Sequence, residues 1–98
     1  MDNFLRKEVY FSGSVQGVGF RYKSCDIASK FCITGTVENL KDGRVKLVVE
    51  GSLFEVQGFL FELRQRMIQN ITNDVCEDHS YKGEFSNFKI LSWTMQFV

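Results

Sequence analysis

Residues 14–23 read SVQGVGFRYK, in which two glycines separated by one residue are followed by a phenylalanine and Arg21. Before the glycines, residues 8–15 (EVYFSGSV) are rich in β-forming side chains, which predicts a strand. After them, residues 22–31 (YKSCDIASKF) predict a helix, because candidate inward positions recur at helical spacing. Those positions are Tyr22, Cys25, Ala28 or Ser29, and Cys32. The stretch is therefore the connection between a first strand and a first helix.

A hairpin and a second helix are predicted next. Residues 33–39 (ITGTVEN) and 44–50 (RVKLVVE) predict two strands, and the Asp-Gly pair between them is a strong hairpin signal. Ser52 is expected to cap the N-terminus of the second helix. The inward-facing residues of that helix are expected to be Val56, Leu60, Leu63 and Met67.

Two further strands complete the predicted order. They are residues 74–81 and 88–98, and the final LSWTMQFV (residues 91–98) either lengthens the last strand, covers a sheet edge or forms a contact patch. The order β-α-β-β-α-β is typical of the ferredoxin-like split βαβ arrangement. We therefore expect an α+β fold with an antiparallel sheet and two helices on one of its faces, formed by a single domain over residues 1–98.

The composition narrows the possible functions. Lys plus Arg and Asp plus Glu are 12 each, and this balance argues against a general nucleic-acid or membrane-surface binder. The start, MDNFLRKEVY, has no apolar signal region, so a cytoplasmic protein is expected. The three cysteines contain no CxxC pair, which argues against a disulfide framework or a zinc site and predicts free, mostly buried thiols.

The glycine-rich stretch has the features of an anion site. Glycines let the backbone curl and let a ligand approach the amide groups at the start of a helix, where the helix dipole favours negative charge. Arg21 can place two hydrogen bonds on a phosphate. The spacing matches neither the dinucleotide GxGxxG pattern nor the Walker pattern. On these features alone, a tight glycine turn beside an exposed arginine remains an equal alternative.

Two longer segments carry a family resemblance. GSVQGVGFR (residues 13–21) and GTVENLKDGRVKLVVEG (residues 35–51) resemble the acylphosphatase family, and FSNFKI (residues 85–90) is similar to its closing strand. The likeness runs over about residues 7–90. It implies an enzyme that hydrolyses the carboxyl-phosphate bond of acyl phosphates to a carboxylate and phosphate. It also implies that Arg21 binds the phosphate and that Asn39 positions the attacking water. The phosphate site would be completed by the loop amides of Gln16, Gly17, Val18, Gly19 and Phe20.

The chemistry of the implied reaction needs few catalytic groups. A carboxylate is a good leaving group because its acid has a pKa of about 4, so neither a general acid nor a metal is required. The sequence has no HExxH motif and no carboxylate cluster suited to magnesium. We therefore expect no cofactor and no metal, and a monomer whose partners are a small-molecule acyl phosphate and the product phosphate. The physiological acyl group cannot be identified from the sequence.

Two departures keep an alternative open. Position 36 is often a large aromatic in this family and position 38 is often basic, whereas this chain has Thr36 and Glu38. Strand alternation places Glu38 on the face opposite Asn39, so a modest effect is expected. The alternative is a non-catalytic anion or acyl-phosphate-binding module on the same fold. An RNA-binding module of similar topology is disfavoured because residues 44–50 contain no aromatic.

Overall fold

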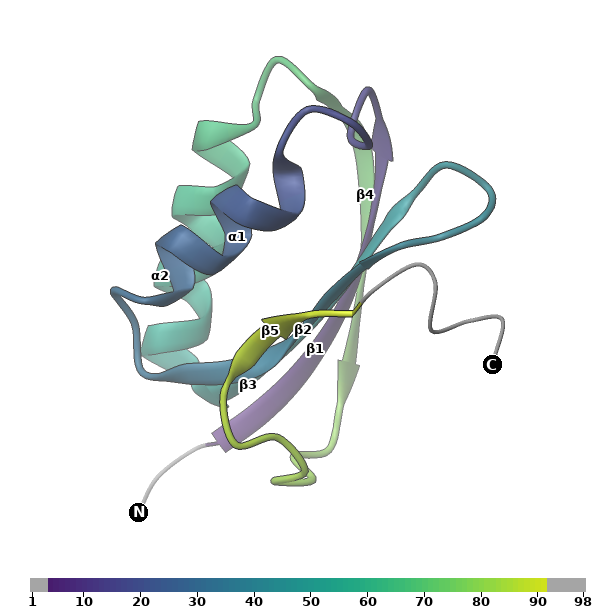
Figure 1. The fold of residues 1–98 in the computed structure, drawn as a ribbon. Helices are drawn as coiled ribbons and strands as arrows, with labels where there is room; N and C mark the ends of the chain where they lie inside the picture. The colour runs from purple at the N-terminus through teal and green to yellow at the C-terminus, as the bar shows by residue number, and fades with distance from the viewer. Residues whose placement is uncertain (1–3, 92–98) are drawn as a thin grey trace.

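The computed structural model describes residues 4–91 and contains two helices packed on one face of a five-stranded sheet (Figure 1). The elements, in chain order, are β1 (Phe4–Gly13), α1 (Phe20–Ala28), β2 (Ile33–Asn39), β3 (Val45–Ser52), α2 (Leu53–Arg66), β4 (Ile71–His79) and β5 (Phe88–Ile90). This order confirms the predicted α+β, ferredoxin-like class. Neither of these helices is long and apolar enough to cross a membrane.

The strand order in the sheet is β4-β1-β3-β2-β5. The β1–β3, β1–β4 and β2–β3 pairs are antiparallel, but β5 runs parallel to β2. The sheet was predicted to be antiparallel, and the parallel pairing of β5 at this edge makes it mixed. The physical reason is the direction of the chain. The last residue of β4 lies at the same end of the sheet as the first residue of β2, so the chain that leaves β4 enters β5 from that end and runs parallel to β2. The predicted continuation of this strand over residues 92–98 lies outside the described residues.

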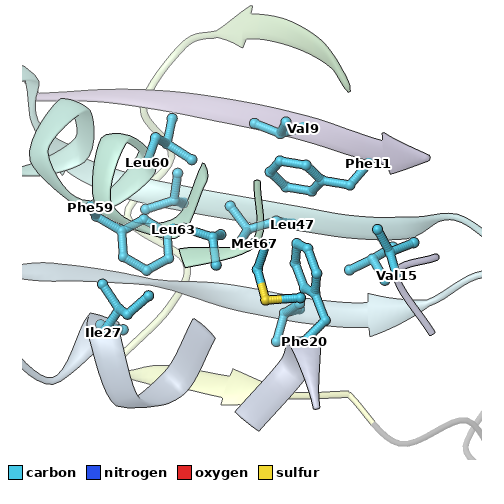
Figure 2. Close-up of a cluster of buried hydrophobic side chains, with 14 of the residues drawn as sticks. Val9, Phe11, Val15, Phe20, Ile27, Leu47, Phe59, Leu60, Leu63 and Met67 are labelled. Atoms are coloured by element: carbon cyan, nitrogen blue, oxygen red, sulfur yellow. The ribbon is translucent and has the colours of Figure 1, made fainter. Parts of the chain in front are cut away.

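The core lies between the sheet and the two helices (Figure 2). Alternate residues of β1 and β3, among them Val9, Phe11 and Leu47, are fully buried and face the helices. From α2 the predicted inward residues Val56, Leu60, Leu63 and Met67 are all buried, and Phe59 joins them. The side chain of Ser52 accepts a hydrogen bond from the Glu55 amide at 3.3 Å, which confirms the predicted N-cap.

Helix α1 is rotated relative to the prediction. Its buried residues are Phe20, Ser24, Ile27 and Ala28, whereas Tyr22 is 72% exposed. The cause is the packing of Phe20 on Phe11, whose ring centroids are 5.1 Å apart, because this contact fixes which side of the helix faces the sheet. The rotation leaves Cys25 only half-buried.

The three cysteines are free, as expected, but they are not mostly buried. Cys32 lies beyond the end of α1 and is exposed, and Cys76 is exposed on β4. The expectation of mostly buried thiols was wrong, because Cys32 lies past the end of α1 and Cys76 lies on the edge strand β4.

Candidate active site

The connection between β1 and α1 contains two glycines in the left-handed region of backbone space. Gly17 has φ +77° and Gly19 has φ +78°, a conformation that side chains with a Cβ rarely adopt. A Cβ built on either residue would meet no atom within 4 Å, so both glycines border open space. Gly19 is also the N-cap residue of α1, and it offers no side chain to cap the first amides of the helix. The start of α1 therefore has no side-chain cap and borders an open space.

The loop is held in place from two sides. On one side the Gln16 Nε2 donates hydrogen bonds to the carbonyl oxygens of Leu40 at 2.8 Å and Arg44 at 2.9 Å, in the hairpin between β2 and β3. On the other side the Ser14 amide donates to the Asn70 carbonyl at 2.9 Å, and the Asn70 Nδ2 donates to the Ser14 carbonyl at 3.1 Å. The glycine loop is therefore clamped between the hairpin and the connection from α2 to β4.

A pocket of about 240 Å³ lies at this loop. Its lining residues are Val15, Gly17, Gly19, Phe20, Arg21, Tyr22 and Asn39. Arg21 and Asn39 are 18 positions apart in the sequence but meet here. Asn39 is the last residue of β2 and pairs with the buried Val45, so its side chain lies on the helix-facing side of the sheet. Arg21 is the second residue of α1 and reaches the same space from the helix.

Arg21 is the available cation of this pocket. Its side chain is half-buried, and it forms no ion pair with any residue between Phe4 and Leu91. A guanidinium whose charge is not already neutralised retains its full attraction for an incoming anion. The pocket therefore combines a positive charge, backbone donors and a side-chain amide.

Two members of the predicted set do not line the pocket. The Gln16 side chain is committed to the hairpin, and Val18 packs against the core. Tyr22 and Val15 line the pocket although their sequence positions gave no reason to select them. The contact of Asn70 with Ser14 was also not predicted, because it joins residues 56 positions apart in the chain.

The two departures from the family pattern lie away from the pocket. Glu38 pairs with Lys46 in the β2–β3 ladder, on the face opposite Asn39, as predicted from strand alternation. Thr36 is buried on that same outer face. Neither residue lines the pocket, so an unfavourable carboxylate is kept out of the anion site.

A larger pocket of about 430 Å³ lies between α2 and the β1–β4 edge. It also has cations, Lys7 and Arg64, but both are already paired. Lys7 lies 2.5 Å from Asp78, and Arg64 lies 3.1 Å from Asp74. Because these carboxylates offset the positive charge, the smaller pocket at Arg21 is the better site for an anion despite its size.

The fold and the pocket define a class of protein: a ferredoxin-like α+β domain with a candidate anion pocket where β1 meets α1. The family model for acylphosphatase matches residues 7–90. The acylphosphatase of Syntrophus aciditrophicus (strain SB) is 43% identical over 88 residues, which cover 88% of this chain and 91% of that protein. The acylphosphatase of Paenarthrobacter aurescens (strain TC1) is 37% identical over 91 residues, which cover 92% and 97% of the two chains.

The structural comparison agrees. The crystal structure of acylphosphatase from Bacillus subtilis superposes with a TM-score of 0.80 at 28% identity, covering 90% of this chain and 99% of that one. The chain belongs to the acylphosphatase family. It is an enzyme that hydrolyses acyl phosphates, as the resemblance of its two glycine-containing segments implied.

Proposed function

We propose that Arg21 and the backbone amides of the glycine loop bind the phosphoryl group of the acyl phosphate, and that Asn39 orients the attacking water. The amides are those of Gln16, Gly17, Val18, Gly19 and Phe20. The observation that carries the proposal is the pocket in which the uncommitted guanidinium of Arg21 and the amide of Asn39 meet beside two left-handed glycines.

The binding step follows from charge. An acyl phosphate carries its negative charge on the phosphoryl oxygens, and charge builds up there and on the leaving oxygen during transfer. The Arg21 guanidinium can donate two hydrogen bonds to these oxygens, and the loop amides supply further donors that need no reorganisation. The clamp by Gln16 and Asn70 fixes the loop, so these donors are already in position when the substrate arrives.

The chemical step needs a correctly placed water more than a strong base. The carboxamide of Asn39 does not exchange protons near neutral pH, but it can hold a water by hydrogen bonds. The water oxygen forms a bond to phosphorus while the bond from phosphorus to the acyl oxygen breaks, and that electron pair leaves with the carboxylate. A phosphoryl oxygen of the substrate accepts the proton of the water. The products are a carboxylate and inorganic phosphate.

Hydrolysis is expected to be unchanged by a chelator. The leaving carboxylate needs no protonation or metal, since its acid has a pKa of about 4, and Arg21 supplies the positive charge at phosphorus. The measurement is the initial rate on an aromatic acyl phosphate with EDTA, compared with the rate in added Mg²⁺. A rate that falls with EDTA and recovers with Mg²⁺ would contradict this metal-independent scheme.

Replacing Gln16 with alanine is expected to loosen the loop. The change removes two hydrogen bonds to the hairpin, which should lower the free energy of unfolding by about 1–3 kcal/mol. Misplacement of the loop donors should lower kcat/KM by up to about 100-fold. Urea unfolding and acyl phosphate turnover measure the two effects. Gln57→Ala, an exposed glutamine of α2, is the matched control and should change neither quantity.

The proposal extends to the setting in which the enzyme works. We place it in the cytoplasm as a monomer, acting on a small acyl phosphate without a nucleic-acid or membrane partner. Three free thiols fit a reducing compartment, and the zero net charge fits a protein without a polyanionic partner. Size-exclusion chromatography with light scattering tests the monomer. Acyl phosphate turnover by the purified chain also tests the alternative of a module that binds the substrate without hydrolysing it.

A further inference from the structure

The outer face of the sheet, the one opposite the helices, brings together three side chains of metal-binding type. Glu8 of β1 is the register partner of Glu77 of β4, and His79 lies two residues further along β4 on the same face. One ligand atom from each residue can be chosen so that all three lie within 4.8 Å of one another. The His79 Nε2 lies 3.1 Å from a Glu77 carboxylate oxygen and 3.8 Å from the Glu8 Oε1.

We propose that Glu8, Glu77 and His79 form a binding site for a divalent transition metal of the zinc type. Zinc binds imidazole and carboxylate at about 2.0–2.2 Å in a tetrahedral arrangement, which places its ligand atoms about 3.4 Å apart. The two separations from the His79 Nε2 lie on either side of this value, and the Glu8 and Glu77 ligand atoms lie within 4.8 Å of each other, so the three groups must draw together around the ion. An imidazole among the ligands favours zinc over magnesium or calcium, which prefer oxygen. The three protein ligands leave a fourth position for water.

Neighbouring groups support the ligand arrangement. The Arg6 Nε donates to the Glu8 Oε2 at 3.0 Å, which leaves the Glu8 Oε1 toward His79. A hydrogen bond of this kind to the remote oxygen orients a ligating carboxylate. Arg6 also pairs with Glu50 and Glu84, so its one positive charge is shared among three carboxylates.

The charge balance at the site favours a cation. Burial acts to raise the pKa of Glu8, but the hydrogen bond from Arg6 and nearby positive groups outweigh it, so the pKa is lowered and the carboxylate is ionised near neutral pH. Glu77 is partly exposed and adds a second carboxylate. Lys46 is a nearby cation that opposes metal binding, although its ammonium group lies over the Tyr10 ring, 5.6 Å from the centroid. A metal ion would therefore meet two carboxylates, one of them shared with Arg6, and an imidazole whose contact with Glu77 it would replace.

The position of the site gives it a structural consequence. β4 lies at the edge of the sheet and is hydrogen-bonded only to β1. A metal held by both strands would cross-link β4 to β1. Because the site exists only in the folded chain, metal binding would stabilise the folded state by mass action. The site lies on the face away from Arg21 and Asn39, so occupancy should not alter hydrolysis.

The test is calorimetric titration of Zn²⁺ into the full chain carrying Cys32→Ser and Cys76→Ser, which removes the exposed thiols as competing ligands. We expect one zinc per chain, no binding of Mg²⁺ at the same concentration, and a melting temperature that rises with zinc. His79→Ala and Glu77→Gln should each weaken binding at least about tenfold, because loss of even a supporting group costs that much in metal sites.

The matched control is Asp78→Asn, which removes a carboxylate of the same strand whose side chain points to the other face and pairs with Lys7. This variant should bind zinc as the unmutated background does. Absence of zinc binding in the background would overturn the proposal. Equal affinity in the background and in His79→Ala, with both folded by circular dichroism, would overturn it as well.

Discussion

Replacing Arg21 with alanine is expected to lower kcat/KM for an aromatic acyl phosphate by about a thousandfold or more, with inhibition by inorganic phosphate lost as well. The side chain supplies the uncommitted positive charge of the pocket, and arginines that stabilise a transferring phosphoryl group contribute about 10³–10⁵ in rate. Because the proposed role of Arg21 covers both the bound and the reacting phosphoryl group, kcat should fall and the KM should rise. Steady-state kinetics with phosphate as inhibitor measure both effects.

The control for this variant is another arginine of the same domain. Arg66 is exposed near the end of α2 and pairs with Glu62 and Asp26. It does not line the pocket at Arg21, so no role in phosphoryl transfer is assigned to it. Arg66→Ala also removes an arginine side chain, but from an exposed position outside the pocket, and kcat/KM should equal that of the parent enzyme. Arg21→Lys keeps the charge but not the two-pronged geometry, so it should recover part of the activity. An Arg21→Ala enzyme within about tenfold of the parent, below the loss expected for one preorganised donor, would exclude the assigned role.

Replacing Asn39 with alanine is expected to separate binding from chemistry. The rate constant kcat should fall by about 10²–10³, the range seen when one preorganised hydrogen-bonding group is removed. Inhibition by inorganic phosphate should be nearly unchanged, because Arg21 and the loop amides remain. This pattern identifies an interaction made mainly in the transition state. The measurements are kcat and the inhibition constant of phosphate for the variant and the parent.

Asn39 also ends β2 next to the hairpin turn, so a folding defect must be separated from a catalytic one. Asn73→Ala, an exposed asparagine of β4, is the matched control for loss of a carboxamide. Urea unfolding of both variants reports any change in stability. If phosphate binding and turnover fell together in Asn39→Ala, Asn39 would be a binding residue and the proposed division of roles would be wrong.

Local signals in the sequence predicted the elements that local interactions determine. The cap by Ser52 and the inward stripe of α2 are both confirmed, because capping and helical spacing act within a few residues. Of the predicted inward positions of α1 only Ala28 is buried, because the buried face depends on the contact between Phe20 and a distant strand residue, Phe11. The parallel pairing of β5 with β2 likewise depends on the course of the chain after β4 and has no signal in either strand.

The candidate site also combines features that the sequence predicted with long-range contacts that it did not. The family resemblance selected Arg21 and Asn39, and the structure brings them to one pocket. The sequence could not show that the Gln16 side chain holds the hairpin or that Asn70 holds the loop at Ser14, because both contacts join residues far apart in the chain. It also could not show that the cations of the larger pocket are neutralised by Asp74 and Asp78. These long-range contacts decide which of the two pockets suits an anion.

The most direct test of the phosphate site is a titration of the ¹⁵N-labelled chain with inorganic phosphate, followed by NMR. We predict that the largest shifts fall on the amides of residues 16–20 and on the Arg21 Nε, and that they disappear in Arg21→Ala. Shifts centred instead on Lys7 and Arg64, in the larger pocket beside α2, would contradict the assignment of phosphate binding to the glycine loop.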